Sequence, residues 1–118
     1  MHGAVSDATL YLVAEVKRYI KEHFQDPDLS VASIARSFHL TPSYFSSLFA
    51  KSTGMSAVKY ITRQRVGYAA RELLNSHKSI EAISEEAGFT SPTYFYKVFK
   101  KQMNVTPSEY RRCSGQNP

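Results

Sequence analysis

The sequence predicts an all-α protein of seven helices, in which two helix-turn-helix lobes are joined by a long connector helix. Three observations support this prediction. Apolar residues recur at helical spacing along the chain, and no alternating strand pattern competes with them. Most of the expected helices are bounded by a hydroxyl cap, a proline at the first helical position or a terminal glycine. Residues 29–60 also resemble residues 79–110, which indicates that one structural unit occurs twice.

The repeat is carried by matched residues on both sides of one corner. Six residues recur fifty positions later: Pro42, Tyr44, Phe45, Phe49, Lys51 and Tyr60 return as Pro92, Tyr94, Phe95, Phe99, Lys101 and Tyr110. Before the Thr-Pro corner the offset is one less, so that Ile34 matches Ile83. We interpret this as one residue, Ser91, added at the second corner, because turns absorb insertions that packed helices do not tolerate.

Four helices are expected in the first part of the chain. Ser6 or Asp7 caps the first, which should end near Gln25 because Pro27 disfavours helical backbone in the residue before it. The second begins near residue 31, and the third follows a threonine cap and a proline and ends at a glycine. The connector helix is expected at about 57–74, with an apolar set consisting of Val58, Ile61, Tyr68, Ala69, Leu73 and Leu74.

The second part of the chain repeats this plan. Ser79 caps a helix that ends at Gly88, and the next helix runs from Ser91-Pro92 to about Met103. Asn104 stands where the first unit has a glycine, and asparagine also tolerates the left-handed conformation. A capping box, Thr106-Pro107-Ser108-Glu109, opens a last short helix through Tyr110.

These boundaries predict one domain with two tails. The expected parts are a tail at 1–7, a domain at 8–112 and a disordered tail at 113–118. Within the domain the first helix-turn-helix is expected at about 31–53, the connector helix at about 57–74 and the second helix-turn-helix at about 80–103.

The charges are segregated along the chain. The net charge is +5, and neither residues 29–71 nor residues 87–108 contain a carboxylate. Such segregation creates a positive field on one side, which is the footprint of a polyanionic partner. A basic patch alone fits a solvated charged face equally well.

A helix-turn-helix places its second helix in the major groove of DNA, which requires an apolar inner face and a small or polar outer face. Both second helices fit this requirement. The outer face expected of the first is Ser43, Ser46, Ser47 and Ala50, and that of the second is Thr93, Tyr96, Lys97, Lys100 and Lys101. Thr41 and Ser91 can also present helix-start N–H groups to a phosphate. An 18-residue connector spans about 27 Å, and successive major-groove faces lie about 34 Å apart, so adjacent grooves are within reach.

The motifs of both units resemble one family. The string GFTSPTYF at 88–95, with FKK at 99–101 and TPSEYR at 106–111, resembles the signature of the AraC/XylS family of bacterial transcription regulators. Ile34-Ala35, PSYF at 42–45, and Arg65, Ala69, Leu73 and Leu74 resemble its first unit and connector. The resemblance covers roughly residues 8–112. It implies a homeodomain-like, C-terminal DNA-binding domain that binds an asymmetric double-stranded site as one chain, is monomeric when isolated, and has RNA polymerase as its partner in transcription activation.

The resemblance assigns roles by position. Base-facing roles fall to Ser43, Ser46, Ser47, Thr93, Tyr96 and Lys97, and phosphate-facing roles to Thr41, Lys51, Arg63, Arg65, Ser91, Lys100 and Lys101. The first unit offers only hydroxyls, whereas Arg, Asn or Gln would discriminate bases by about 1–3 kcal/mol each. We therefore expect the second unit to carry more of the sequence preference.

Other classes of function have less support. The four histidines are scattered singly and Cys113 has no paired base, so the sequence indicates no catalytic, metal or cofactor site and no enzyme. No segment reaches the roughly 18 apolar residues of a membrane span, and a single cysteine fits a reducing compartment, which predicts a cytoplasmic protein at the nucleoid. The alternative is a helical interaction module whose basic face binds an acidic protein. That function would require an exposed apolar groove, whereas DNA binding would weaken steeply with salt.

Overall fold

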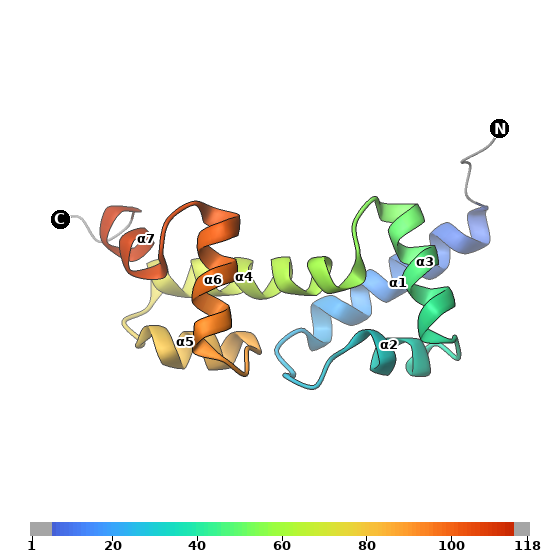
Figure 1. Cartoon of the computed structure of the whole chain (residues 1–118), viewed down its shortest axis with the longest axis horizontal. Helices are drawn as coiled ribbons and strands as arrows, with labels where there is room; N and C mark the ends of the chain where they lie inside the picture. The colour runs from blue at the N-terminus through green and yellow to red at the C-terminus, as the bar shows by residue number, and fades with distance from the viewer. Residues whose placement is uncertain (1–5, 115–118) are drawn as a thin grey trace. The chain divides into compact units, whose positions relative to one another are not determined.

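The protein is described by a computed structural model, in which residues 6–114 are placed. This part of the chain forms seven helices and no strand (Figure 1). The helices are α1 (Asp7–His23), α2 (Val31–Ser37), α3 (Pro42–Thr53), α4 (Ala57–Asn75), α5 (Ile80–Ala87), α6 (Pro92–Met103) and α7 (Pro107–Ser114). The prediction of an all-α fold with seven helices is confirmed.

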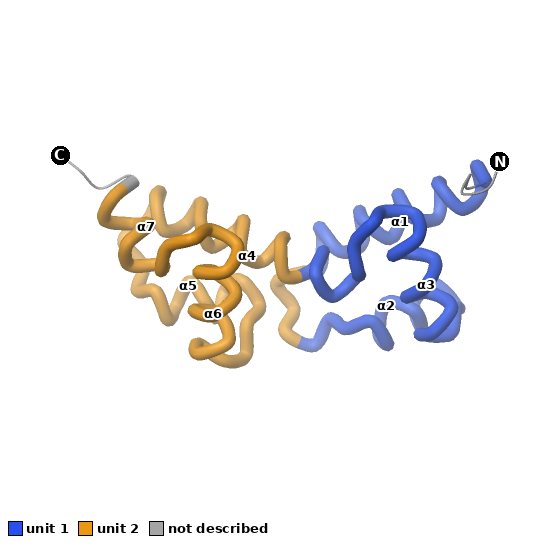
Figure 2. The backbone as a smooth tube through the Cα atoms, turned by 45° about the horizontal axis from the view of Figure 1, so that its top comes forward, with its two compact units in different colours: residues 1–23, 28–61 blue, residues 24–27, 62–118 orange. Residues whose placement is uncertain are grey.

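The chain divides into two compact units (Figure 2). Unit 1 consists of residues 1–23 and 28–61, and unit 2 of residues 24–27 and 62–118. The long helix α4 therefore begins in unit 1 and ends in unit 2. The short segment Phe24–Pro27 belongs to unit 2, although the residues on either side of it in the sequence belong to unit 1.

Unit 1 is built around α3, which packs against both α1 and α2. The core consists of Val13, Val16, Ile20, Leu29, Ile34, Ala35, Phe45, Phe49, Ala57 and Ile61, all buried. The Phe49 ring lies 5.8 Å from the Phe45 ring and 5.6 Å from the Tyr60 ring, measured between centroids. This aromatic row joins α3 to the first turn of α4.

Unit 2 repeats this packing with a different set of helices. The Phe99 ring lies 5.6 Å from both the Phe95 ring and the Tyr110 ring, so α7 takes the place of the first turn of α4. The second half of α4 takes the place of α1: Val66, Ala69 and Leu73 are buried and have the same spacing as Val13, Val16 and Ile20. The structural repeat is therefore longer than the sequence match between residues 29–60 and 79–110 indicates.

The two helix-turn-helix corners share a hydrogen-bonded helix end. The Leu40 N–H donates to the Ala35 carbonyl over 2.8 Å, and the Phe89 N–H donates to the Ser84 carbonyl over 3.1 Å. In each case a left-handed residue precedes the donor, which is the Schellman arrangement. That residue is His39 (φ 60°) in unit 1 and Gly88 (φ 107°) in unit 2.

The caps of α3 and α6 correct the position of the added residue. The Tyr44 N–H donates to Thr41 Oγ1 over 3.2 Å, and the Tyr94 N–H donates to Ser91 Oγ over 3.1 Å. Ser91 is thus the structural equivalent of Thr41, and the extra residue at the second corner is Thr90. The interpretation of Ser91 as the addition was wrong, because a helix cap keeps its place relative to the helix it starts.

Three other sequence expectations are also corrected. Helix α1 ends at His23 rather than near Gln25, because residues 24–27 pack in unit 2. Val58 is 55% exposed, because Ala57 takes the inward position and is buried. Helix α7 continues through Ser114, so Cys113 is helical and exposed rather than part of a disordered tail. The remainder of the two expected tails, residues 1–5 and 115–118, lies outside the described residues.

Candidate nucleic-acid interface

The buried aromatic pair of α3 determines which of its side chains face outward. Phe45 and Phe49 are both 1% exposed, and their spacing of one helical turn fixes the rotation of the helix about its axis. Pro42 occupies the first helical position, where its missing N–H leaves no hydrogen bond unmade. The outer face then consists of exposed small or polar side chains: Ser43, Ser46, Ser47, Ala50 and Lys51.

Helix α6 has the same construction and a more basic outer face. Phe95 and Phe99 are fully buried, and Pro92 again occupies the start of the helix. The exposed side chains are the predicted Thr93, Tyr96, Lys97, Lys100 and Lys101. The Tyr96 ring contacts the Phe95 ring edge-on at 5.9 Å, so the core supports one of these outward side chains.

An exposed tyrosine flanks the outer face of each helix and lies outside the set of predicted DNA-facing residues. Tyr44 is 55% exposed and Tyr94 is 47% exposed. Tyr94 lies three and seven residues before Lys97 and Lys101, so these side chains share one side of α6. The signal was available in the repeat, because Tyr44 has the same spacing to Ser47 and Lys51. Both phenols are candidates for hydrogen bonds to phosphate.

The electrostatics of the two outer faces favour an anion. Neither α3 nor α6 contains a carboxylate. The ion pairs of Arg18 with Glu15 and of Lys78 with Glu72 and Glu86 lie outside both helices. None of them neutralises an outward lysine of α3 or α6, so these lysines keep their charge available to a ligand.

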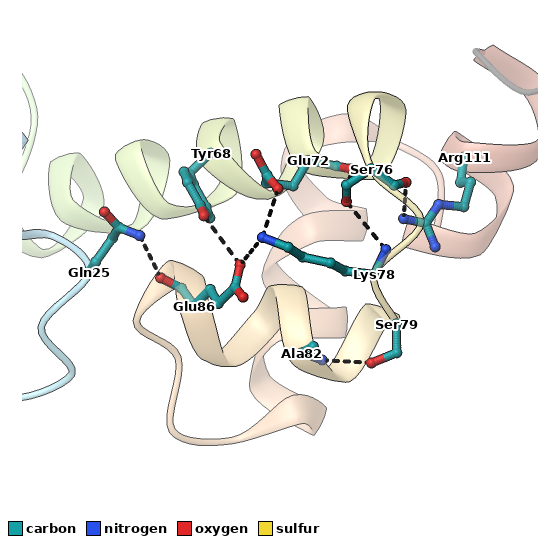
Figure 3. A network of polar contacts seen from close by, with 9 residues as sticks. All are labelled: Gln25, Tyr68, Glu72, Ser76, Lys78, Ser79, Ala82, Glu86 and Arg111. Atoms are coloured by element: carbon teal, nitrogen blue, oxygen red, sulfur yellow. Dashed lines mark hydrogen bonds and ion pairs between the residues drawn. The ribbon is translucent and has the colours of Figure 1, made fainter.

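Two acidic residues of unit 2, Glu72 and Glu86, lie between α4 and α5 and interact there with Lys78 (Figure 3). Lys78 Nζ lies 2.9 Å from Glu86 Oε1 and 3.4 Å from Glu72 Oε1, and the Tyr68 hydroxyl donates to Glu86 Oε1 over 3.3 Å. The hydrogen bonds to Glu86 and Glu72 raise the pKa of Lys78, and desolvation raises the pKa of Tyr68. The cluster fixes the loop between the two helices. It adds little stability, because solvent and salt screen exposed ion pairs.

The residues predicted to face phosphate fall into two groups. The first group is at least partly exposed and consists of Thr41, Lys51, Arg63, Ser91, Lys100 and Lys101. Arg65 is different, because its guanidinium donates to two backbone carbonyls. Nε lies 2.7 Å from the Phe24 oxygen and Nη2 lies 2.9 Å from the Asp26 oxygen. Burial lowers the pKa of this half-buried side chain. Arg65 therefore binds the protein itself, and we leave it out of the phosphate-facing set.

Comparison with known proteins decides the family. The sequence model of a family described as "Helix-turn-helix domain" matches residues 34–113 of this chain. The solved C-terminal domain of AraT, a response regulator from Geobacillus stearothermophilus, is 33% identical, with a TM-score of 0.85 over 89% of this chain and 87% of that one. The chain belongs to the AraC/XylS family. The sequence resemblance is thereby confirmed.

Other members of the AraC/XylS family extend the comparison. The regulatory protein PocR of Salmonella typhimurium is 42% identical over 85% of this chain, and the arabinose operon regulatory protein of Escherichia coli is 34% identical over 84%. The solved DNA-binding domain of AdpA, in complex with a target DNA, is 28% identical with a TM-score of 0.79, over 85% of this chain and 89% of that one. The chain spans 33% and 34% of the lengths of the first two relatives.

The family consists of transcription regulators with a helix-turn-helix domain. In residues 6–114, no three His, Cys, Asp or Glu side chains are grouped so that they could hold a metal ion. Among the described helices, none combines the length and the apolar character needed to cross a membrane.

Proposed function

We propose that this chain binds double-stranded DNA sequence-specifically, as the DNA-binding domain of a bacterial transcription regulator. The observation that carries the proposal is the pair of helices α3 and α6, each rotated by a buried aromatic pair so that a carboxylate-free face is exposed. The likeness to the AdpA domain, which was solved with its target DNA, supports the same conclusion. In this proposal α3 and α6 enter adjacent major grooves on one side of the duplex.

The roles of the outward side chains follow from their chemistry. Ser43, Ser46 and Ser47 offer hydroxyls, which can contact any base and discriminate weakly. Lys97 offers a charged donor to guanine, while Thr93 and Tyr96 offer an apolar surface beside a hydroxyl, so α6 carries most of the sequence preference. The phosphate contacts come from Thr41, Lys51, Arg63, Ser91, Lys100 and Lys101, and they position the protein on the duplex.

The decisive experiment is selection from random duplexes of about 30 base pairs at physiological salt, followed by sequencing of the bound fraction. An asymmetric consensus with two elements about one helical turn apart would support readout by both units. A single short element would indicate that α3 contacts mainly the backbone. If no sequence is enriched, the proposal fails and binding of an acidic protein to the basic face becomes the leading alternative.

Salt dependence separates DNA binding from that alternative. Four of the proposed phosphate-facing residues are cationic: Lys51, Arg63, Lys100 and Lys101. Neutralising about four phosphates predicts a slope of roughly −3 to −4 for log K against log salt, or about a hundredfold loss between about 50 and 200 mM. A much flatter dependence would contradict the set of phosphate contacts.

We further propose RNA polymerase as the protein partner at promoters, where the chain would act at the nucleoid in the cytoplasm as a monomeric domain of an activator. Transcription in vitro from a promoter that carries the selected site tests this. Stimulation that disappears when the site is scrambled would support activation, and inhibition would contradict it. Sedimentation of the chain without DNA measures its oligomeric state.

A further inference from the structure

We propose that Arg65 is a positioning residue for DNA recognition, which holds the corner between α5 and α6 and thereby sets where α6 begins. This inference rests on the proposed function, because its consequence is measured on DNA. Its basis is a set of contacts inside unit 2, which we call the Arg65 clamp: Arg65, the segment Phe24–Pro27, and the corner residues Gly88 and Phe89.

The first half of the clamp is a pair of hydrogen bonds to one backbone segment. Arg65 donates from Nε to the Phe24 carbonyl over 2.7 Å and from Nη2 to the Asp26 carbonyl over 2.9 Å. The planar guanidinium presents these donors in a fixed fork, which an ammonium group cannot reproduce. The Gln25 side chain of the same segment donates from Nε2 to the Glu86 carbonyl over 3.0 Å, in the last turn of α5 (Figure 3).

The second half of the clamp is the close approach of the corner backbone. A Cβ built on Gly88 would lie 2.4 Å from the Phe24 oxygen and 2.7 Å from Arg65 Nε. Both distances are shorter than van der Waals contact, so the corner has no room for any side chain at this position. The glycine backbone is therefore packed directly against the hydrogen bonds that Arg65 makes.

The corner then connects the clamp to α6. Arg65 Cζ lies 6.0 Å from the centre of the Phe89 ring, which is 6% exposed. The Phe89 ring lies 5.1 Å from the Phe95 ring and 6.1 Å from the Tyr94 ring, both in the first turn of α6. A shift of the corner would thus move the start of the helix that carries Thr93, Tyr96 and Lys97.

Unit 1 provides an internal comparison without this clamp. By the matched spacing of the buried residues in α1 and α4, the counterpart of Arg65 is Leu12, which has no side-chain donor. The counterpart of Gly88 is His39, which is exposed and carries a Cβ at the same kind of left-handed position. The corner of unit 1 therefore forms without an arginine. The clamp is an additional feature of unit 2, whose helix α6 has the more basic outer face.

Substitutions that separate charge from geometry test the inference. Arg65→Lys keeps the positive charge and loses the fork, and Arg65→Met loses both. The matched control is Arg71→Met, which removes a charge from an exposed position of the same helix. Binding is measured as a function of salt on the duplex selected by the wild type and on a random-sequence duplex.

We expect both Arg65 variants to bind the selected duplex on the order of tenfold more weakly, since a misplaced helix loses the equivalent of about one base contact. Binding of Arg65→Lys to the random duplex and its salt slope should match those of the wild type. A phosphate contact gives a different result: Arg65→Lys would bind like the wild type, and Arg65→Met would lose affinity equally on both duplexes with a slope shallower by about one. That result would overturn the inference.

Hydrogen exchange of the free protein provides a readout that requires no DNA. The Gly88 and Phe89 amides should exchange faster in Arg65→Lys than in the wild type, because they make the hydrogen bonds of the clamped corner. The His39 and Leu40 amides make the same bonds in unit 1 and should be unaffected. Equal acceleration at both corners would indicate global destabilisation and would overturn a local role. If the wild type shows no sequence preference, the proposed function fails. If the wild type is selective and Arg65→Lys binds DNA and exchanges its amides like the wild type, only the role of the Arg65 clamp is overturned.

Discussion

Helices α3 and α6 begin and pack alike, and they differ on the face that points away from the core. Each starts with a hydroxyl cap followed by proline, and each buries a phenylalanine pair one turn apart. The outer face of α3 is mainly serine, while that of α6 carries Lys97, Lys100 and Lys101. Packing constrains the cap and the buried pair, because a change there destabilises the unit. The outer positions are exposed and do not pack in the core, so the ligand rather than folding stability determines which side chains occur there.

The corners that precede these helices differ in the same way. Both end the preceding helix with a left-handed residue, but His39 lies on the surface of unit 1 and Gly88 is packed against a carbonyl and a guanidinium in unit 2. Both corners make the same local hydrogen bonds, and the corner of unit 2 makes tertiary contacts in addition. Substitutions at matching positions of the two units test this difference.

The largest effect is expected for Gly88→Ala. A left-handed alanine costs about 1–2 kcal/mol, and a Cβ forced against packed atoms costs about 1–3 kcal/mol more, so the free energy of unfolding should fall by about 3 kcal/mol. Gly54→Ala is the matched control. Its φ of 77° is also left-handed, but its added Cβ would meet nothing within 4 Å, so only the backbone cost of about 1 kcal/mol applies. Chemical denaturation measures the free energy of unfolding of both variants. Equal losses would show that the atoms around residue 88 can shift to accommodate a Cβ.

The next effect concerns DNA rather than stability. Lys97→Ala should weaken binding to the selected duplex by about 1–3 kcal/mol and relax the preference at one or two base pairs. Ser47→Ala, at the matching position of α3, should cost well under 1 kcal/mol because a hydroxyl discriminates bases weakly. Titration on the selected duplex and on duplexes with single base-pair changes measures both. An equal loss of affinity for selected and random DNA would show that Lys97 contacts phosphate and does not read a base.

A stabilising substitution is expected at the other corner. His39 is a β-carbon-bearing residue at φ 60°, a conformation that glycine adopts without steric cost. His39→Gly should raise the free energy of unfolding by about 0.5–1 kcal/mol, which is the relieved backbone cost less the greater entropy of an unfolded glycine. His39→Ala keeps the Cβ and should bring no gain. A destabilised His39→Gly protein would indicate that the histidine side chain contributes more than its exposure suggests.

Most of the local structure could be predicted from the sequence, because it depends on residues close together in the chain. The caps at Thr41, Ser79 and Ser91 and the left-handed ends at Gly54, Gly88 and Asn104 are all confirmed. The outward faces of α3 and α6 were predictable for the same reason, since helical geometry places them opposite the buried phenylalanines. Their contacts with DNA remain predictions.

The failures lie where distant residues meet. The resemblance assigned Arg65 to phosphate by its position, and nothing in the neighbouring sequence indicates that residues 24–27, some forty positions earlier, accept its hydrogen bonds. The role of α4 as the counterpart of α1 was also missed, because the two helices share only the spacing of their buried residues. Spacing without residue identity is too weak a signal for a sequence repeat.

The smallest effect is expected at the start of α7, which follows α6 in unit 2, compared with the start of α4, which follows α3 in unit 1. In unit 2 the Glu109 N–H donates to Thr106 Oγ1 over 3.1 Å, and Glu109 Oε1 accepts from the Thr106 N–H over 2.9 Å. This backbone hydrogen bond is the main cause that lowers the pKa of Glu109. In unit 1 the Lys59 N–H donates to Ser56 Oγ over 3.1 Å, and the lysine has no carboxylate with which to return the bond.

The direction of the pH dependence follows from the lowered pKa of Glu109. A carboxyl whose pKa is lower in the folded protein stabilises it above the unfolded pKa, and this contribution is lost as the pH falls through the folded value. Glu109→Gln keeps a capping side chain but no charge, so its melting temperature should lie below that of the wild type at about pH 7, and the two should converge toward about pH 3. Lys59→Gln is the control, because it introduces the same side chain at the matching position of α4 without removing a carboxyl group, so its effect should not follow the same pH dependence. A Glu109→Gln difference that is the same at both pH values would show that the charged form of the carboxyl contributes nothing to the start of α7.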